Sequence, residues 1–404
     1  MNLSRLKFAR TFLCRFYPNV HIVFLCAVIS FVFYSIFYKD LFLFTATYFV
    51  NISMGIRAAR NQARNKVVLL YTPFFGNRWT DYVTLEGDKV EFVEGEKTFH
   101  DCEVSSCVLT YDQSKLLEAD AVGFHARDMP DILPTRLNTQ QIWFYFVLEN
   151  PFNVFVKPDG YAGVFNWTMS YRRESEVYIP YGMYKSIKKE ARDFRQIHAP
   201  DEKDTEVAWL VSNCNAKERR EYVEELQKYI NVSIYGKCGT QTCPKERHSL
   251  ICNALLSRHK FYLAFENGNC PDYITEKYWD NAIDNSIVPV VMGGADYKTL
   301  AIPNSYIDVQ DFASPKKLAE YLQYLAGNDT AYEEYFCWKK QYQRIRTRRA
   351  CELCKQLHNQ SLYTPSRVYT NMAKFWNRKQ CKNSMHLSLS PLARFGYGAR
   401  YFNI

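Results

Sequence analysis

The chain has 404 residues, of which 47% are hydrophobic and 16% aromatic, and its formal net charge is +9. This length and composition exclude wholesale disorder and predict two or three domains, each with its own core. Lysine and arginine are spread along the chain without a nucleic-acid-binding motif, so their charge predicts a solvated basic face or an anionic small substrate rather than nucleic acid.

An apolar run near the N-terminus predicts a membrane anchor. Residues 20–38 (VHIVFLCAVISFVFYSIFY) contain no acid, lysine or arginine, and as a helix they would span about 28 Å, enough for a bilayer core. Residues 1–19 carry basic side chains and no acid, which predicts a cytosolic tail. The rest of the chain would then lie in a lumen. A cleaved signal peptide is the alternative, but its apolar stretch would be shorter and followed by a small-residue site. Residues 41–50 either extend the span or lie at the membrane interface.

Glycosylation triplets and cysteines agree with a secretory lumen. Eleven of the thirteen cysteines follow the apolar run. Only Cys351 and Cys354 have the two-residue gap common in zinc sites, so disulfides are favoured over metal binding. Their connectivity stays open, and the odd number leaves at least one thiol free or paired with another chain. The Asn-x-Ser/Thr triplets that predict glycosylation are at Asn51, Asn166, Asn231, Asn328 and Asn359.

A polar, basic stem is expected over residues 39–65, followed by a first domain over residues 66–200. Short runs of β-branched and aromatic residues predict buried strands at residues 66–71, 107–111, 121–125 and 142–148. Polar or helical stretches separate these strands. That alternation is typical of parallel α/β layers.

The same pattern begins again after a polar linker at residues 198–204. Strands are predicted at residues 206–212, 231–235, 261–265 and 287–292, with helices at 217–229 and after Ser314-Pro315. We expect a second α/β domain over residues 205–360 and a C-terminal extension over 361–404. Because ligands of such domains bind beyond the carboxyl ends of the strands, the loops after the strands should carry the function.

The loop after residues 261–265 holds the most informative residues. It reads FENGNCPDYITEKYWDNA, with Asp272 and Thr275 both suited to cap a helix and with Glu276 and Lys277 in its first turn. A helix start with a lysine favours an anion such as phosphate, and a carboxylate there can accept hydrogen bonds from sugar hydroxyls. An ordinary helix start would explain the same residues.

This stretch resembles the signature of the α1,3/α1,4-fucosyltransferase family. The similarity lies in residues 265–267 (FEN), 272–277 (DYITEK), 281–282 (NA) and 288–293 (VPVVMG), and continues at 165–182, 208–213, 233–236 and 311–325. It covers roughly residues 66–360. The resemblance implies a GT-B architecture, in which two Rossmann-like domains face a cleft. It also implies a single-pass type II protein of the Golgi membrane whose luminal domain inverts the anomeric centre as it transfers fucose from GDP-fucose.

The resemblance assigns the acceptor side to the first domain. Glu149, directly after a strong strand, matches the proposed general base, which would take a proton from the acceptor hydroxyl. Asp128 is the second candidate for this role. Residues 125–128 (HARD) resemble the acceptor-binding motif, although Ala126 departs from it, and they imply acceptor contacts for His125, Arg127 and Asp128. Arg127 stands where the family has arginine for α1,3 linkage.

The resemblance assigns the donor to the second domain. The chain contains no Asp-x-Asp triplet, so no metal held by protein ligands and no cofactor are expected, with stimulation by Mn or Mg left open. Arg172 and Arg173 could reach the cleft or the interface between the domains. Arg220 is the alternative to Arg219, because the alignment could slip by one residue. The expected donor-binding residues are Tyr273, Glu276, Lys277, Asn213, Arg219, Tyr235 and Asn267.

The predicted function is therefore inverting transfer of L-fucose to the 3-hydroxyl of a GlcNAc in a glycoprotein glycan. Three alternatives stay open: another GT-B nucleotide-sugar transferase, a catalytically silent glycan-binding protein of the same fold, and a glycosidase using Glu149 and Asp128 as a carboxylate pair. The acceptor is undecided between the core GlcNAc of an N-glycan and a LacNAc or LacdiNAc antenna.

Overall fold

The computed structural model describes residues 28–29, 64–77, 79, 85–86, 89–154, 158–187, 203–243 and 250–381. Residues 66–404 belong to one compact unit, separate from residues 1–65. Within the described residues, no helix has both the length and the apolarity that crossing a membrane requires. Most of the expected anchor, the stem with Asn51, and the end of the C-terminal extension lie outside the described residues.

The first half of the compact unit is built on a parallel sheet. The strand order among the described residues is β4-β1-β5-β6-β7-β8, and every pairing is parallel. Every residue of β5, β6 and β7 is buried, as expected for a sheet covered on both faces. The strands are β1 (Lys66–Leu70), β4 (Cys107–Thr110), β5 (Ala121–His125), β6 (Ile142–Val147), β7 (Trp167–Ser170) and β8 (Val177–Tyr178).

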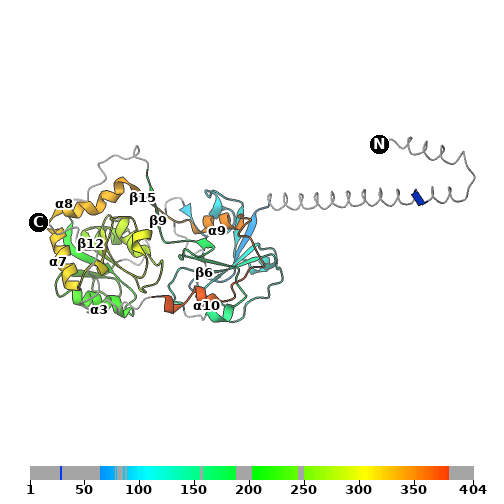
Figure 1. Cartoon of the computed structure of the whole chain (residues 1–404), viewed down its shortest axis with the longest axis horizontal. Coiled ribbons are helices and arrows are strands. Elements are labelled where there is room, and N and C mark those ends of the chain that lie inside the picture. The colour runs from blue at the N-terminus through cyan, green and yellow to red at the C-terminus, as the bar shows by residue number, and fades with distance from the viewer. Residues whose placement is uncertain are drawn as a thin grey trace, which may run out of the picture. The chain divides into compact units, whose positions relative to one another are not determined.

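A second parallel sheet forms the other half (Figure 1). Its order in the described part of the chain is β11-β10-β12-β13-β14. Leu318, Leu322 and Leu325 of α7 (Pro315–Ala326) pack into its core, and Ser314 caps that helix as expected. The other elements of this half are β10 (Asp204–Leu210), α3 (Lys217–Leu226), β11 (Val232–Tyr235), α4 (Leu250–Ser257), β12 (His259–Phe265), β13 (Val288–Met292) and β14 (Ile307–Asp308).

These sheets confirm the predicted α/β class with parallel strands. The predicted strands of both halves are present within one or two residues of their expected bounds. Between and after them lie short elements: β2 (Leu85–Glu86), β3 (Lys89–Val90), η2 (Lys97–Phe99), η3 (Gln113–Leu117), η4 (Pro158–Tyr161), α5 (Glu276–Tyr278), the π-helical turn η6 (Trp279–Ile283), α6 (Tyr297–Leu300), η7 (Val309–Asp311), α8 (Asp329–Glu333) and η8 (Glu334–Lys340).

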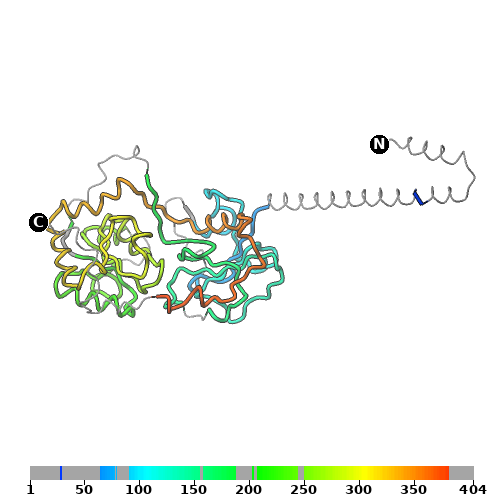
Figure 2. The backbone as a smooth tube through the Cα atoms, in the orientation of Figure 1, coloured from blue at the N-terminus to red at the C-terminus, as the bar shows by residue number. Residues whose placement is uncertain are grey.

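The chain returns to the first half earlier than the boundary expected at residue 360. Strand β15 (Tyr342–Ile345) pairs antiparallel with β9 (Met183–Ser186), and α9 (Arg349–Leu357) then packs into the core of the first half. The segment with α10 (Met372–Phe375) and η9 (Arg378–Gln380) packs against the opposite face of the same sheet. Figure 2 shows this orange-to-red part of the tube running back through the first half.

The predicted disulfides are confirmed, and Cys102 and Cys107 bond to Cys351 and Cys354 rather than to each other. Among the described residues, Cys337 is the one free cysteine, and it is exposed. His358 lies beside Cys107 and Cys354, but their bond uses both thiols and leaves no metal site. The bonds are Cys102–Cys351, Cys107–Cys354, Cys214–Cys238, Cys243–Cys252 and Cys270–Cys381.

Candidate active site

The two sheets bring the ends of their central strands together. Glu149 and Asn150 follow β6 of the first sheet, and Asn267 follows β12 of the second. Asn150 Nδ2 donates a hydrogen bond to Asn267 Oδ1 at 2.8 Å. The expected general base and the expected donor loop are therefore neighbours, as ligand sites at the carboxyl ends of parallel strands require.

Glu149 is half-buried, and its surroundings tune its acidity. Burial raises the pKa of its carboxyl above the ordinary value, and the nearby carboxylates of Glu276 and Glu266 raise it further. The cations Lys277 and Arg127 oppose this shift. A carboxylate with a raised pKa and a cation from each half is suited to accept a proton near neutral pH.

Lys277 lies between two carboxylates of the second half. Its Nζ is 3.1 Å from Glu266 Oε2 and 2.9 Å from Glu276 Oε1, and it donates to Thr275 Oγ1 at 2.7 Å. Burial alone would lower the pKa of this amine, but the two glutamates outweigh burial and hold the pKa above its usual value. Lys277 therefore stays charged, and Glu266 and Glu276 hold its ammonium group in place.

The turn before Lys277 differs from an ordinary helix start. Thr275, rather than Asp272, caps α5, and α5 continues directly into the π-helical turn η6, so no regular helix follows the loop. Asp272 instead adopts a left-handed conformation with φ at +59°. Its carboxylate accepts hydrogen bonds from Arg173 N at 3.0 Å and Arg173 Nε at 3.1 Å. Arg173 thus lies at the interface between the halves, one of the two places expected for it.

Arg219 and Arg220 take different positions. The guanidinium of Arg219 is buried and donates to the carbonyl oxygens of Phe265 at 2.9 Å and Asn213 at 2.8 Å, which end β12 and follow β10. Burial lowers its pKa, while Glu266 raises it. Arg220 is exposed and pairs with Glu224 at 3.2 Å on the same helix. Arg219 is therefore the arginine that faces the strand ends.

Two of the expected donor-binding residues, Tyr235 and Tyr273, are buried and leave little surface for a ligand. Tyr235 packs edge-on against His259, with ring centroids 5.8 Å apart. Tyr273 packs against Tyr171 at 4.8 Å between ring centroids. Burial raises the pKa of Tyr273 well above its ordinary value, so it stays protonated. The ring of Tyr273 shapes the wall of the site between the halves.

The expected acceptor residues form a linked group at the end of β5. His125 Nδ1 bonds to Asp128 Oδ2, and the same carboxylate accepts from Phe75 N at 2.7 Å and Gly76 N at 2.6 Å. Arg127 lies over the ring of Phe75, 4.9 Å from its centroid. Asp128 is therefore occupied in holding the loop after β1, which favours Glu149 over Asp128 as the base.

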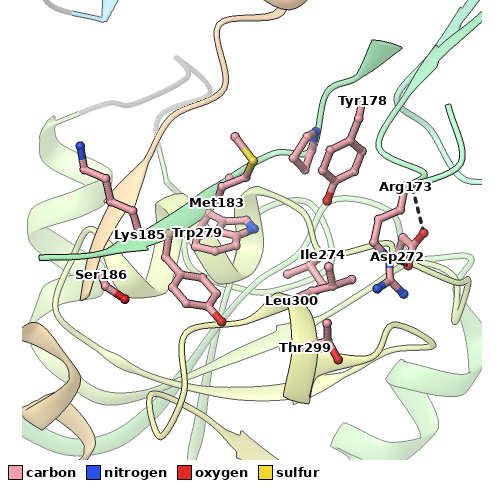
Figure 3. Close-up of a pocket in the computed structure, with 13 residues that line it drawn as sticks. Arg173, Tyr178, Met183, Lys185, Ser186, Asp272, Ile274, Trp279, Thr299 and Leu300 are labelled. Carbon is pink, nitrogen blue, oxygen red and sulfur yellow. Dashed lines mark hydrogen bonds and ion pairs between the residues drawn. The ribbon is translucent and has the colours of Figure 1, made fainter. Parts of the chain in front are cut away.

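A cavity of about 430 Å³ is lined by β9 and by Asp272 and Ile274 of the donor loop. Figure 3 shows Arg173 and Asp272 at one end, with Trp279, Ile274 and Leu300 farther in. Glu149 and Lys277 do not line this cavity. The side chain of Asp272 faces it, whereas Lys277 points toward Glu266.

The glycosylation triplets differ in accessibility. Asn231 and Asn359 are exposed, and Asn328 is half-buried as the cap of α8. Asn166 is 2% exposed, and its Nδ2 donates to the carbonyl oxygens of Pro365 at 2.7 Å and Arg367 at 2.8 Å. A glycan on Asn166 is incompatible with this folded structure, because its amide nitrogen has no room for a sugar.

Three contributors to the site were missed from the sequence. Glu266 was part of a matched motif, but only the structure shows that it pairs with Lys277. Asn150 is a polar residue directly after a fully buried strand, which was an available signal for a site. The partnership of Arg173 with Asp272 joins residues 99 positions apart and left no signal in either segment.

Comparison with known proteins places this chain in one family. The profile of "Fucosyltransferase, N-terminal" matches residues 63–182, and that of "Glycosyltransferase family 10 (fucosyltransferase) C-term" matches residues 200–376. A solved structure titled an alpha1,3-fucosyltransferase with GDP-fucose shares 17% identity and a TM-score of 0.46 over 74% of this chain and 92% of its own. That likeness is too low to add support.

Curated relatives agree with these profiles. "Glycoprotein 3-alpha-L-fucosyltransferase A" of Drosophila melanogaster is 39% identical over 68% of this chain, although the match spans only 55% of that relative's length. "Alpha-(1,3)-fucosyltransferase C" of the same organism is 32% identical over 77% of each chain. The predicted family is confirmed: this chain belongs to glycosyltransferase family 10, the fucosyltransferases.

Proposed function

We propose that this protein is an inverting α1,3-fucosyltransferase, which moves L-fucose from GDP-fucose to the 3-hydroxyl of a GlcNAc in a glycoprotein glycan. One observation carries the proposal. Glu149, with a raised pKa, follows a central strand of one half and interacts electrostatically with Lys277 of the other. A base on one side of a site and cations on the other are what transfer from a nucleotide-sugar requires.

In the proposed reaction, the acceptor oxygen attacks C1 of fucose while the bond from C1 to the β-phosphate oxygen breaks. Glu149 takes the proton of the attacking hydroxyl, and GDP leaves with the electrons of the broken bond. The attack comes from the face opposite GDP, so the β linkage of the donor becomes α in the product. Lys277 and Arg219 counter the charge that develops on the phosphate.

The surrounding residues fit two binding sides. The donor would lie over the ends of β10 and β12, where Arg219 joins the two strands through their carbonyls. The acceptor would lie against the first half near Arg127, whose guanidinium lies over the ring of Phe75. This division corresponds to a GT-B architecture. We also propose that residues 20–38 anchor the protein in the Golgi membrane with the enzyme in the lumen.

The α1,3 linkage is proposed on the names of the relatives and on Arg127. The structure favours Glu149 alone as the base, because Asp128 already accepts two backbone hydrogen bonds. A glycosidase would need both carboxylates free at the sugar. Whether a metal ion stimulates transfer is tested separately, by adding a chelator to the assay with and without Mn.

The test is a transfer assay with the full chain in detergent, labelled GDP-fucose and a panel of N-glycan cores and LacNAc and LacdiNAc antennae. The proposal is supported if a GlcNAc becomes labelled and an α1,3-specific fucosidase then removes the label. Competition with GDP-mannose and UDP-sugars separates this donor from those of other transferases. A folded protein that binds GDP but labels no acceptor would favour a silent glycan-binding protein instead.

A further inference from the structure

The side chain that follows the base bonds to the donor loop. Asn150 directly follows Glu149, and its side chain is completely buried. Its Nδ2 donates to Asn267 Oδ1 at 2.8 Å, which is the contact between the two strand ends described above. Glu149 itself bonds to neither residue, so its distance from the donor depends on how the backbone around it is held.

The orientation of the Asn150 amide follows from its second partner. Phe152 N donates to Asn150 Oδ1 at 3.0 Å, the local turn typical of asparagine. Because a backbone N–H cannot accept, the oxygen of the amide must face Phe152 and the nitrogen must face Asn267. The amide therefore acts as a fixed spacer with one end in each half.

The donor loop approaches Asn150 closely at Gly268. A Cβ on Gly268 would lie 2.8 Å from Asn150 Nδ2 and 2.9 Å from Asn150 Cγ. Both distances are shorter than any ordinary contact. The backbone of the loop thus rests against the Asn150 side chain, and a larger residue at position 268 would force one of the two to shift.

The same two segments are also held by the C-terminal part of the chain and by α3. Arg378 Nε donates to Pro151 O at 3.2 Å, and Cys381 is bonded to Cys270 of the donor loop. Asn269 Nδ2 donates to Glu218 Oε2 at 2.8 Å, which ties the loop to α3. Unlike these contacts, the bond between Asn150 and Asn267 is made by the residue directly next to Glu149.

We propose that Asn150 is a positioning residue that sets the distance between Glu149 and the fucose carbon of the bound donor. This rests on the proposed function. Asn150 is completely buried and its amide already bonds to Asn267 and Phe152, so we expect it to govern the rate of transfer rather than the affinity for GDP. A displacement of about 1 Å between base and reacting atoms can lower a rate about 100-fold.

The test compares Asn150→Ser with Asn150→Ala in the full chain. A serine hydroxyl can still accept from Phe152 N and keep the local turn, but it is too short to reach Asn267. Both variants should lower kcat for fucosyl transfer by roughly 10- to 100-fold. GDP affinity by calorimetry should change less than about threefold, and so should KM for GDP-fucose.

A double-mutant cycle with Asn267→Ala tests the partnership. If the two amides act through each other, the double variant should lose no more kcat than Asn150→Ala alone. A merely structural role would instead lower the melting temperature and the GDP affinity together. Asn166→Ala is the matched control, because this equally buried amide lies away from the site and its loss should affect stability without a selective loss of kcat.

Wild-type kcat in Asn150→Ser, or additive losses in the cycle, would overturn the proposal. So would a loss of GDP affinity that matches the loss of kcat. Failure of the wild-type protein to transfer fucose, even though it binds GDP in the titration, would refute the proposed function instead. A loss of transfer in the variants alone tests the role of Asn150.

Discussion

Lys277 and Glu266 form an ion pair at 3.1 Å in which the glutamate side chain has no exposed surface. Glu266 also accepts from Thr275 N at 2.8 Å and from Thr275 Oγ1 at 2.9 Å. The donor loop therefore folds around a buried charge. Removing one partner of such a pair is destabilising because the other charge stays in a medium of low polarity.

Lys277→Ala should accordingly lower the free energy of unfolding by about 3–5 kcal/mol and abolish GDP binding. Adding Glu266→Gln should restore much of the stability, since glutamine can still accept from Thr275. It should not restore GDP binding, because the phosphate would still lack its lysine. Thermal unfolding and calorimetry of both variants distinguish the two effects. Full GDP affinity in Lys277→Ala would remove Lys277 from the donor site.

Glu149→Gln should lower fucosyl transfer by at least about 100-fold while GDP binding persists. The base must be deprotonated to act, so kcat in the wild type should fall as pH drops through the pKa of Glu149. Burial raises this pKa, so kcat should begin to fall at a higher pH than an exposed glutamate would cause. Measurement of kcat against pH checks this fall. Near-normal turnover in Glu149→Gln would assign the base elsewhere.

His125 should make stability depend on pH. Burial lowers the pKa of His125 to about 4 from 6.5, although Asp128 opposes the shift. Between these values the unfolded chain binds a proton that the folded chain does not, so stability is complete above about pH 6.5 and falls as pH drops toward 4. The full loss is about 3 kcal/mol.

Denaturant unfolding at pH 7.5, 6 and 4.5 measures this slope. His125→Asn is the control, because an asparagine amide can occupy the position of Nδ1 beside Asp128 without titrating. The difference in stability between pH 7.5 and 4.5 should be smaller in the variant than in the wild type. An identical pH dependence in both proteins would mean that His125 is not the titrating group.

The disulfides make a specific pattern that mass mapping can check. Non-reducing digestion should yield Cys102 linked to Cys351 and Cys107 linked to Cys354, with Cys337 alkylated before reduction. Removing Cys351 and its partner should lower the free energy of unfolding by about 2–5 kcal/mol, because that bond closes a long loop. A bond between Cys351 and Cys354 would contradict the packing of α9.

Glycan mapping of the secreted or full-length protein should find no sugar on Asn166, whose side chain is buried with both amide hydrogens bonded. Asn231 and Asn359 are exposed and should carry glycans if the chain passes through a secretory lumen. Occupancy of Asn166 in active protein would show that this buried position can open. No glycan on any triplet would count against the expected compartment.

Local patterns in the sequence were enough to determine the two parallel sheets and the family. Buried parallel strands read as continuous apolar runs such as residues 121–125 and 142–148, and a motif such as 272–277 is contiguous in the chain. The position of Glu149 directly after a strand was readable for the same reason. Each of these features depends on residues that are neighbours in sequence.

Only the tertiary structure decided which residues meet across the chain. The pairing of Cys107 with Cys354, the return of α9 to the first half, and the contacts of Asp272 with Arg173 and of Asn150 with Asn267 all join segments far apart in sequence. Composition and periodicity report which face of an element is buried, but not what covers it. The site is made by such contacts, so its residues could be named from the sequence while their partners had to come from the fold.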